Sequence, residues 1–318
     1  MKKILIIGSI NMDMAAEVDH TPVAGETILT DSVKLVPGGK GANQAFAAGR
    51  LGGDVTFLGA VGADSYGRIE KENLEKAGVD VSPVIERDDI STGLAFITVN
   101  KDGDNAIVVA AGANMTLSKK EIEDNILLLK QCDIVILQME IPVETVVFAA
   151  KTAKALGKTV ILDPAPVPKV FPEELYSYLD IIKPNETELK MLTGMGDSIE
   201  ELEAATDILR KKGVSNVVVT LGGKGVYINT AQGNKQMVPA LKVEVADTTA
   251  AGDTFTAAMT LKIAQGEKLE TAVRYANYVS ALVVTKKGAQ SSIPTREEAE
   301  KFIEKIISRT DPAARFVS

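Results

Sequence analysis

The sequence predicts an α/β fold in which a doubly wound, mostly parallel sheet is flanked by helices and carries a small projecting β-sheet. Along the chain, short β-branched runs alternate with longer helical patterns. Several of these runs are almost wholly apolar, as expected of parallel strands buried on both faces. Two stretches, within residues 14–36 and 91–110, instead combine alternating residues with turn signals such as that at 101–104. We expect them to form antiparallel strands that project from the main sheet as a lid.

The strands expected in the main sheet are short runs rich in Val, Ile and Leu. They cover residues 3–10, 55–61, 134–138, 159–163, 181–183, 217–221 and 226–229. Three intervening helices are expected to begin at capping boxes, in which a Ser or Thr and a Glu three residues later bind each other's backbone amides. These pairs are Ser118 with Glu121, Ser198 with Glu201, and Thr295 with Glu298. No linker or internal repeat divides the chain, so we expect a single domain over residues 1–318.

The composition limits the classes of function. A chain of 318 residues with 45% hydrophobic residues can bury a large core. The net charge of −8 comes without a basic stripe, which argues against a nucleic-acid partner. No apolar run approaches the roughly 20 residues of a membrane span, and the N-terminal run is too short for a signal peptide, so we expect a cytoplasmic protein. A single cysteine, Cys132, and a single histidine, His20, exclude disulfide, multi-thiolate and His–His sites, and we expect the first in the core and the second in a turn.

A helix is predicted to begin near residue 250. Its apolar face is indicated by the helical spacing of Phe255, Ala258, Met259 and Ile263. The run Ala250-Ala251-Gly252 therefore lies at a helix N-terminus, where free backbone N–H groups favour an anion. Asp253 follows in the first turn. An anion cradle beside a carboxylate suits phosphoryl transfer to a hydroxyl group, whereas the alternative is that Asp253 only caps the helix.

Polar residues gather after the predicted strands, where an open parallel sheet binds its ligands. They are Asn11, Asp13, Gln138, Glu140, Asp163, Asn185, Glu186, Glu188 and Thr220. A second glycine-rich turn, residues 38–43, leads into a helix of small residues, and its Lys40 and Asn43 are placed to donate to hydroxyl groups. The alternative for its glycines is tight packing alone.

Familiar nucleotide motifs are absent. The chain has no P-loop, no Gly-x-Gly-x-x-Gly after its first strand and no protein-kinase signature. It instead resembles the ribokinase-like, or phosphofructokinase B, family of sugar kinases, and does so over nearly its whole length. The resemblance rests on motifs in the expected order at residues 8–13, 38–44, 183–188, 247–255 and 286–292. It implies the fold predicted above, ATP as phosphoryl donor and, from the motifs at 38–44 and 285–290, the primary hydroxyl of D-ribose as acceptor.

The resemblance also implies roles for individual residues. Asp253 would be the general base, and Ala250, Ala251 and Gly252 would form the anion hole. The sugar ligands would be Asn11, Asp13, Gly39, Lys40, Asn43, Glu140 and Asp253. The nucleotide ligands would be Asn185, Thr220, Leu221, Gly222, Gly223, Lys224, Gly225, Gly252 and Asn277. Glu188 would hold Mg²⁺ through water. A K⁺ site would be formed by Asp247, Thr249, Val283, Lys286, Gly288 and Ser292, mainly through backbone carbonyls, and the lid strands would form a homodimer.

Alternatives to this function stay open. A kinase of another sugar or nucleoside would use the same chemistry, and a non-catalytic sugar- or nucleotide-binding protein could share the fold, although it would not need Asp253 beside the cradle. A nicotinamide-dependent oxidoreductase would need the missing dinucleotide fingerprint.

Many family members have glycine where this chain has Ala250, and alanine adopts a positive φ less readily.

Overall fold

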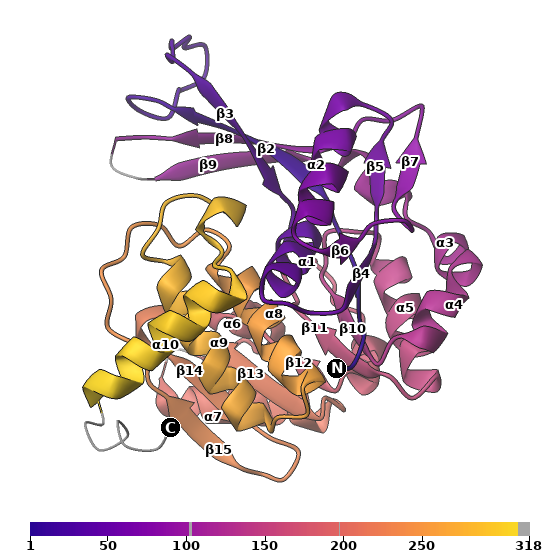
Figure 1. The fold of residues 1–318 in the computed structure, drawn as a ribbon, viewed down its shortest axis with the longest axis vertical. Helices are drawn as coiled ribbons and strands as arrows, with labels where there is room; N and C mark the ends of the chain where they lie inside the picture. Colours follow the sequence, from indigo (N-terminus) through magenta and orange to yellow (C-terminus); the bar gives the residue numbers. More distant parts are fainter. Residues whose placement is uncertain (102–103, 197, 311–318) are drawn as a thin grey trace.

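The computed structural model describes residues 1–101, 104–196 and 198–310, with the side chains of residues 309 and 310 left aside. In this part of the chain, a nine-stranded sheet forms the centre of the molecule (Figure 1). Its strands lie in the order β15 (Lys235–Val238), β14 (Val226–Asn229), β13 (Asn216–Thr220), β12 (Ile181–Ile182), β11 (Thr159–Leu162), β10 (Ile134–Leu137), β1 (Ile4–Ile7), β4 (Val55–Leu58) and β6 (Val79–Asp80). The strands from β13 to β6 pair in parallel, and β14 and β15 are antiparallel. The predicted doubly wound, mostly parallel sheet is confirmed.

Helices cover both faces of this sheet because its strands are apolar on both sides. Ile4 and Ile6 of β1 face one core, and Leu5 and Ile7 face the other. The first core is closed by α1 (Lys40–Arg50), α2 (Ser65–Lys76), α8 (Ala251–Ala264), α9 (Leu269–Val283) and α10 (Arg296–Thr310). The second is closed by α3 (Lys119–Asp124), α4 (Ile126–Gln131), α5 (Val143–Ala155), α6 (Glu186–Thr193), α7 (Ile199–Lys211) and a 3₁₀ helix at Glu173–Tyr178.

A separate four-stranded sheet projects beyond one end of the main sheet (Figure 1). It runs β3 (Val33–Gly38), β2 (Asn11–Glu17), β8 (Gly93–Val99) and β9 (Asn105–Ala110). The expectation of antiparallel strands is wrong for its central pair, because β2 and β8 run in parallel. Residue spacing predicts that a strand forms but not the direction of its neighbour, which explains the error. Residues 102–103 of the predicted turn at 101–104 lie outside the described residues.

Several strand boundaries differ from the prediction. The run 55–61 is divided at Gly59, after which β5 (Ala60–Gly62) leaves the main sheet and pairs with β7 (Ile85–Arg87). The first strand ends at Ile7, and the next residues carry the chain into β2. β6, β7 and β15 were not expected, since they are short and have no sustained apolar run. No helix among the described residues is long and apolar enough to cross a membrane.

The local predictions for the helices are mostly confirmed. Ser118 with Glu121 and Thr295 with Glu298 form reciprocal capping boxes, and the Ser198 hydroxyl accepts from the amide of Glu201. Cys132 is buried at the end of α4, and His20 is an exposed turn residue bonded to Glu26. The sequence predicted one apolar face for α8, but the helix is buried on nearly every side, because it is enclosed between α1, α9 and the sheet.

Candidate active site

The site forms where the order of the sheet changes direction. β1 lies between β10 and β4, and the helices that follow β1 and β10 lie on opposite faces of the sheet. We call the region at the carboxyl ends of these strands the crevice, because open α/β sheets bind their ligands at such a place. The Ser9 hydroxyl, after β1, donates to Glu140 Oε2, after β10, at 2.5 Å. The same oxygen accepts from the backbone amide of Lys40 at 3.0 Å. Glu140 therefore joins three segments at the crevice.

Glycines allow the first lid strand and the start of α1 to meet here. Gly39 has φ 86°, and a Cβ on it would lie 2.8 Å from the amide nitrogen of Asn11. A Cβ on Gly38 would lie 2.4 Å from Asp13 Oδ2. At Gly39 the turn packs directly on the backbone of β2, whereas Gly38 leaves room for the carboxylate of Asp13. Asn11 is fixed further by Asn114, whose Nδ2 donates to Asn11 Oδ1 at 2.8 Å.

Asp253 does not cap its own helix. Its Oδ2 accepts from Asn43 Nδ2 and its Oδ1 accepts from Gln44 Nε2, each at 3.1 Å. Asp253 is 7% exposed and lies in the first turn of α8, as predicted. The helix begins after Ala250, which adopts φ 59° and ψ 5°. Ala250 is the one residue other than glycine with a positive φ in the described chain. The alanine thus takes the left-handed conformation that glycine adopts more readily.

Gln44 links the carboxylate of Asp253 to a second one. Its Nε2 donates also to Asp163 Oδ2 at 3.0 Å, and its Oε1 accepts from Gln138 Nε2 at 2.7 Å. The ammonium of Lys183 lies 2.9 Å from the same Asp163 oxygen, and both side chains are buried. Gln138 and Asp163 were predicted from the sequence to lie at the carboxyl ends of their strands, whereas Gln44 and Lys183 were assigned no role. Their only signal was their position inside the motifs at 38–44 and 183–188.

Burial and charge perturb the titration of the site. Burial, with the charges of Glu140 and Asp253, raises the pKa of Asp13 to about 7. Burial disfavours the charged form of Lys40, but the surrounding Asp253, Asp163, Glu140 and Glu188 outweigh it and raise the pKa. Burial and the charge of Asp163 raise the pKa of Glu188. The predicted sugar residues thus share one acidic crevice that closes around Lys40.

The predicted nucleotide residues lie along the carboxyl ends of β12 and β13. Asn185 forms an isolated bridge with Thr220, and it also forms a capping box with Glu188 at the start of α6. This structural role of the Asn-x-x-Glu pair was not anticipated. Residues 222–224 form a 3₁₀ turn, and Asn277 of α9 donates to the carbonyl oxygen of Pro239 at 2.8 Å. A Cβ on Gly225 would lie 2.1 Å from the Val238 carbonyl oxygen, so this turn packs closely against the end of β15.

A loop at the end of α9 gathers most of the residues predicted to bind K⁺. Asp247 Oδ2 accepts from the amide of Gly288, and its Oδ1 accepts from the amide and hydroxyl of Thr249. Although burial favours the neutral form, these bonds lower the pKa of Asp247. Val283 and Lys286 form the adjoining turn through a 3.0 Å backbone bond. The Ser292 hydroxyl donates to the carbonyl of Ala289.

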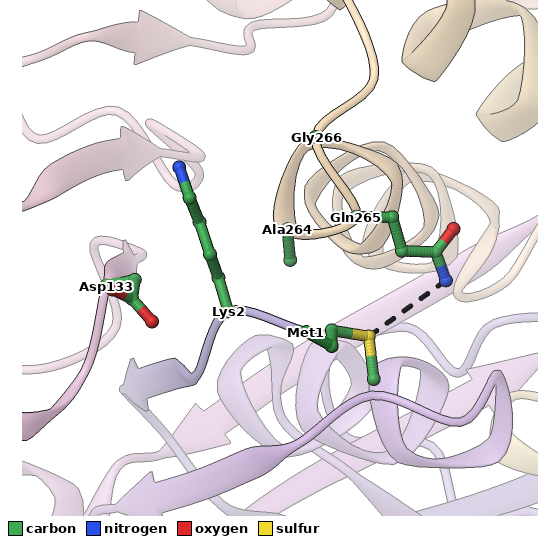
Figure 2. A pocket seen from close by; sticks show the side chains of 6 residues that line it. All are labelled: Met1, Lys2, Asp133, Ala264, Gln265 and Gly266. Atoms are coloured by element: carbon green, nitrogen blue, oxygen red, sulfur yellow. Dashed lines mark hydrogen bonds between the residues drawn. The ribbon is translucent and has the colours of Figure 1, made fainter.

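A surface hollow lies away from this chemistry. Figure 2 shows it at the opposite end of β1 and α8, and it is lined by Met1, Lys2, Asp133, Ala264, Gln265 and Gly266. Asp133 is engaged there by the backbone amide of Lys3 at 2.8 Å. No group of three or more His, Cys, Asp or Glu side chains in the described residues is arranged to hold a metal ion. We therefore take the crevice, not the hollow, as the candidate site.

Known proteins share this arrangement. The chain matches the pfkB family of carbohydrate kinases over residues 1–296. It is 39% identical over 304 residues to a ribokinase of Haemophilus influenzae, with 95% of this chain and 99% of that relative covered. It is 36% identical over 301 residues to a deoxyribokinase of Salmonella typhi, with 94% and 98% covered. The structure of Arabidopsis thaliana ribokinase complexed with ribose and ATP superposes with a TM-score of 0.91 at 35% identity, covering 95% of this chain and 99% of that one.

The fold is that of a carbohydrate kinase. The chain belongs to the pfkB family of carbohydrate kinases.

Proposed function

We propose that this enzyme transfers the γ-phosphoryl group of ATP to the primary hydroxyl of D-ribose, giving D-ribose 5-phosphate and ADP. The observation that carries the proposal is the placement of Asp253. It lies in the first turn of α8 beside the backbone amides of residues 250–252, and Asn43 and Gln44 hold it toward the predicted sugar ligands. The ribokinase relatives and the ribose and ATP complex support this choice of sugar and donor.

In the proposed reaction, Asp253 accepts the proton of the sugar hydroxyl as its oxygen attacks the γ-phosphorus, which is typically worth ~10²–10⁴ in rate. The backbone amides of Ala250, Ala251 and Gly252 stabilise charge on the transferring group. The sugar is held by the crevice residues Asn11, Asp13, Gly39, Lys40, Asn43 and Glu140. If a sugar lacks one hydroxyl group, the buried polar side chains that would bind this group stay unpaired. The site can therefore discriminate strongly between sugars.

ATP would lie along residues 220–225, with Asn185, Gly252 and Asn277 as further contacts. A divalent cation fits this site because negative charge is in excess. The carboxyl groups of Glu140, Asp163, Glu188 and Asp253 surround the ammonium of Lys40, Asp163 also pairs with Lys183, and Asp13 lies close enough to Glu140 and Asp253 to feel their charge. Asp163 Oδ1 is also buried, and it has no hydrogen-bond partner among the described residues. Glu188 would contact Mg²⁺ through water, and Mg²⁺ would supply charge neutralisation of the phosphates.

A monovalent cation is part of the same proposal. The loop residues Asp247, Thr249, Val283, Lys286, Gly288 and Ser292 would bind K⁺, mainly through carbonyl groups, and thereby order the segment that leads into the anion hole. The low pKa of Asp247 supports a permanent negative charge there. We expect potassium buffer to raise turnover over sodium buffer after thorough desalting, and Asp247→Asn to remove the difference. Equal rates of the unsubstituted enzyme in the two buffers would refute this part.

We also propose a cytoplasmic homodimer that pairs through the lid. β9 is exposed along its length, and Val108, with its cross-strand partner Phe96 of β8, presents exposed apolar side chains on one face of the lid. Such a patch is typical of an interaction surface. Light scattering coupled to gel filtration would measure the mass, and Val108→Glu should shift a dimer to a monomer. A monomeric mass for the unsubstituted protein at micromolar concentration would refute the dimer.

The test of the function is ADP release with Mg²⁺-ATP and K⁺ on a panel of ribose, deoxyribose, fructose, adenosine and tagatose, with Asp253→Asn as control. Turnover on ribose that is lost in Asp253→Asn, while calorimetry still detects ribose and ATP binding, would support both substrate and base. Faster turnover on deoxyribose would favour the alternative that the Salmonella relative suggests. Binding of sugar without turnover on any member would favour a non-catalytic binding protein.

A further inference from the structure

The cradle contains a positive charge that the proposed mechanism has not used. Lys183 follows β12 and is 4% exposed, and its ammonium lies 2.9 Å from Asp163 Oδ2. The space beside Gly252 is otherwise open. A Cβ built on Gly252 would meet a single atom within 4 Å outside its own chain surroundings in the described residues, and this atom is Lys183 Nζ, at 3.6 Å. The ammonium therefore adjoins the place where an anion would rest on the α8 amides.

We propose that Lys183 is a further catalytic residue, whose ammonium donates to the phosphoryl group in the cradle while Asp163 holds it in position. This inference rests on the phosphoryl transfer proposed above. In that step a bond forms between the sugar oxygen and the γ-phosphorus, and the bond from this phosphorus to the β-phosphate bridging oxygen breaks. The hydroxyl proton goes to Asp253, and ADP leaves with the electron pair. Charge spreads over the three equatorial oxygens, which is where an added cationic donor acts.

The geometry favours a contact with substrate over mere compensation of Asp163. An ammonium has three N–H donors, and the ion pair with Asp163 uses one. Asp163 Oδ2 is shared between Lys183 and Gln44, and Gln44 also holds Asp253. One chain of hydrogen bonds thus positions both the ammonium of Lys183, which would donate to the phosphoryl group, and the carboxylate of Asp253, the proposed base. Burial of an ion pair carries a desolvation cost, so this pair is weak support for stability and better explained by function.

The experiment compares Lys183→Met with the double variant Asp163→Asn/Lys183→Met, which removes both buried charges. We expect Lys183→Met to lower kcat for ribose by about 10²–10³-fold, the usual loss for one donor to developing charge. Thermal unfolding and the KM for ribose report on the fold and the sugar rim. The double variant should regain thermal stability but remain as slow as the single one, because the donor to phosphate is still missing. Recovery of kcat in the double variant would overturn the proposal and reduce Lys183 to a counterion of Asp163.

The strand β12 offers a matched control at its other end. Lys154 pairs with Asp180, directly before this strand, at 2.6 Å. Lys154→Met should leave kcat and the KM for both substrates unchanged. If the unsubstituted enzyme phosphorylates ribose and Lys183→Met is equally fast, the inference fails and the function stands. If the unsubstituted enzyme phosphorylates no sugar of the panel, the function itself fails.

Discussion

Asn43 donates from Nδ2 to Oδ2 of Asp253 across 3.1 Å, and so joins two residues that are 210 positions apart in the sequence. Asn43 lies near the start of α1 and Asp253 near the start of α8, and these helices pack against each other. The proposed sugar ligand and the proposed base are therefore assembled before substrate arrives. Gln290 completes the arrangement, since its Nε2 donates to Asn43 Oδ1 at 3.1 Å.

Replacing Asn43 should misalign the base. Asn43→Leu keeps the volume but removes the bond to Asp253, and we expect kcat/KM for ribose to fall by about 10²-fold, as small misplacements do. Gln290→Leu removes the bonds of Gln290 with Asn43 and Asn73 but keeps the bond from Asn43 to Asp253, and should lose less. Steady-state kinetics with ATP and ribose would measure both. A wild-type kcat/KM for Asn43→Leu would show that the amide bond has no part in positioning.

Sugar affinity should depend on pH through Asp13. Its pKa of about 7 means that the carboxylate, the better acceptor for sugar hydroxyls, is lost as pH falls below neutrality. Because about a tenth of the carboxyl stays ionised one unit below its pKa, the KM for ribose should rise about tenfold from pH 8 to pH 6. Calorimetric titration of ribose across this range measures the effect without turnover. Asp13→Asn should bind more weakly and without the pH dependence; a flat profile for the unsubstituted enzyme would contradict the assignment.

Ala250 should tolerate glycine. A left-handed alanine costs about 1–2 kcal/mol, and the extra freedom of glycine in the unfolded chain costs about 0.4–1 kcal/mol, so the relief is the larger effect. Ala250→Gly should leave the free energy of unfolding unchanged or raise it by up to about 1 kcal/mol. The matched control is Ala257→Gly in the middle of α8, which should lose about 1 kcal/mol or more. Equal destabilisation of the two variants in urea titrations would argue against strain at Ala250.

The buried Glu70 of α2 destabilises the folded protein by an amount that depends on pH. It is 0% exposed, and neither carboxylate oxygen has a hydrogen-bond partner in the described residues. Burial, assisted by the charge of Asp13, raises the pKa of Glu70 well above its usual 4.5, while the nearby amide of Gly38 opposes this effect without hydrogen-bond geometry. The folded state therefore binds the proton that the unfolded chain releases. Stability contributed by Glu70 is present below pH 4.5 and declines as pH rises toward the folded pKa.

Glu70→Met should accordingly raise the free energy of unfolding by about 1–3 kcal/mol at pH 8, with a smaller gain at pH 5. Urea titrations at the two pH values would measure it. Glu75→Met, at an exposed position of the same helix, should change stability by no more than about 0.5 kcal/mol. A loss of ribose affinity in Glu70→Met would instead assign the carboxyl to the sugar crevice.

Local patterns carried much of the fold. Apolar runs such as 134–138 and 159–163 marked parallel strands correctly because burial on both faces dictates their composition. The prediction of one strand over residues 55–61 was wrong. The run is apolar on both sides of Gly59, although the chain passes into another sheet after this residue. The parallel pairing of β2 with β8 was equally hidden, because a strand's pattern does not name its neighbour.

By itself the sequence determined most strands of the main sheet, the polar residues at the carboxyl ends of these strands and the helix start that has Asp253 in its first turn. These follow from periodicity and backbone geometry within short segments. Only the tertiary structure decided that Asn43 and Gln44 hold Asp253, that Gln44 also binds Asp163, and that Lys183 adjoins Gly252. Each of these contacts crosses between segments far apart in the chain, and packing of α1 against α8 and the strand ends fixes side-chain distances that no local pattern encodes.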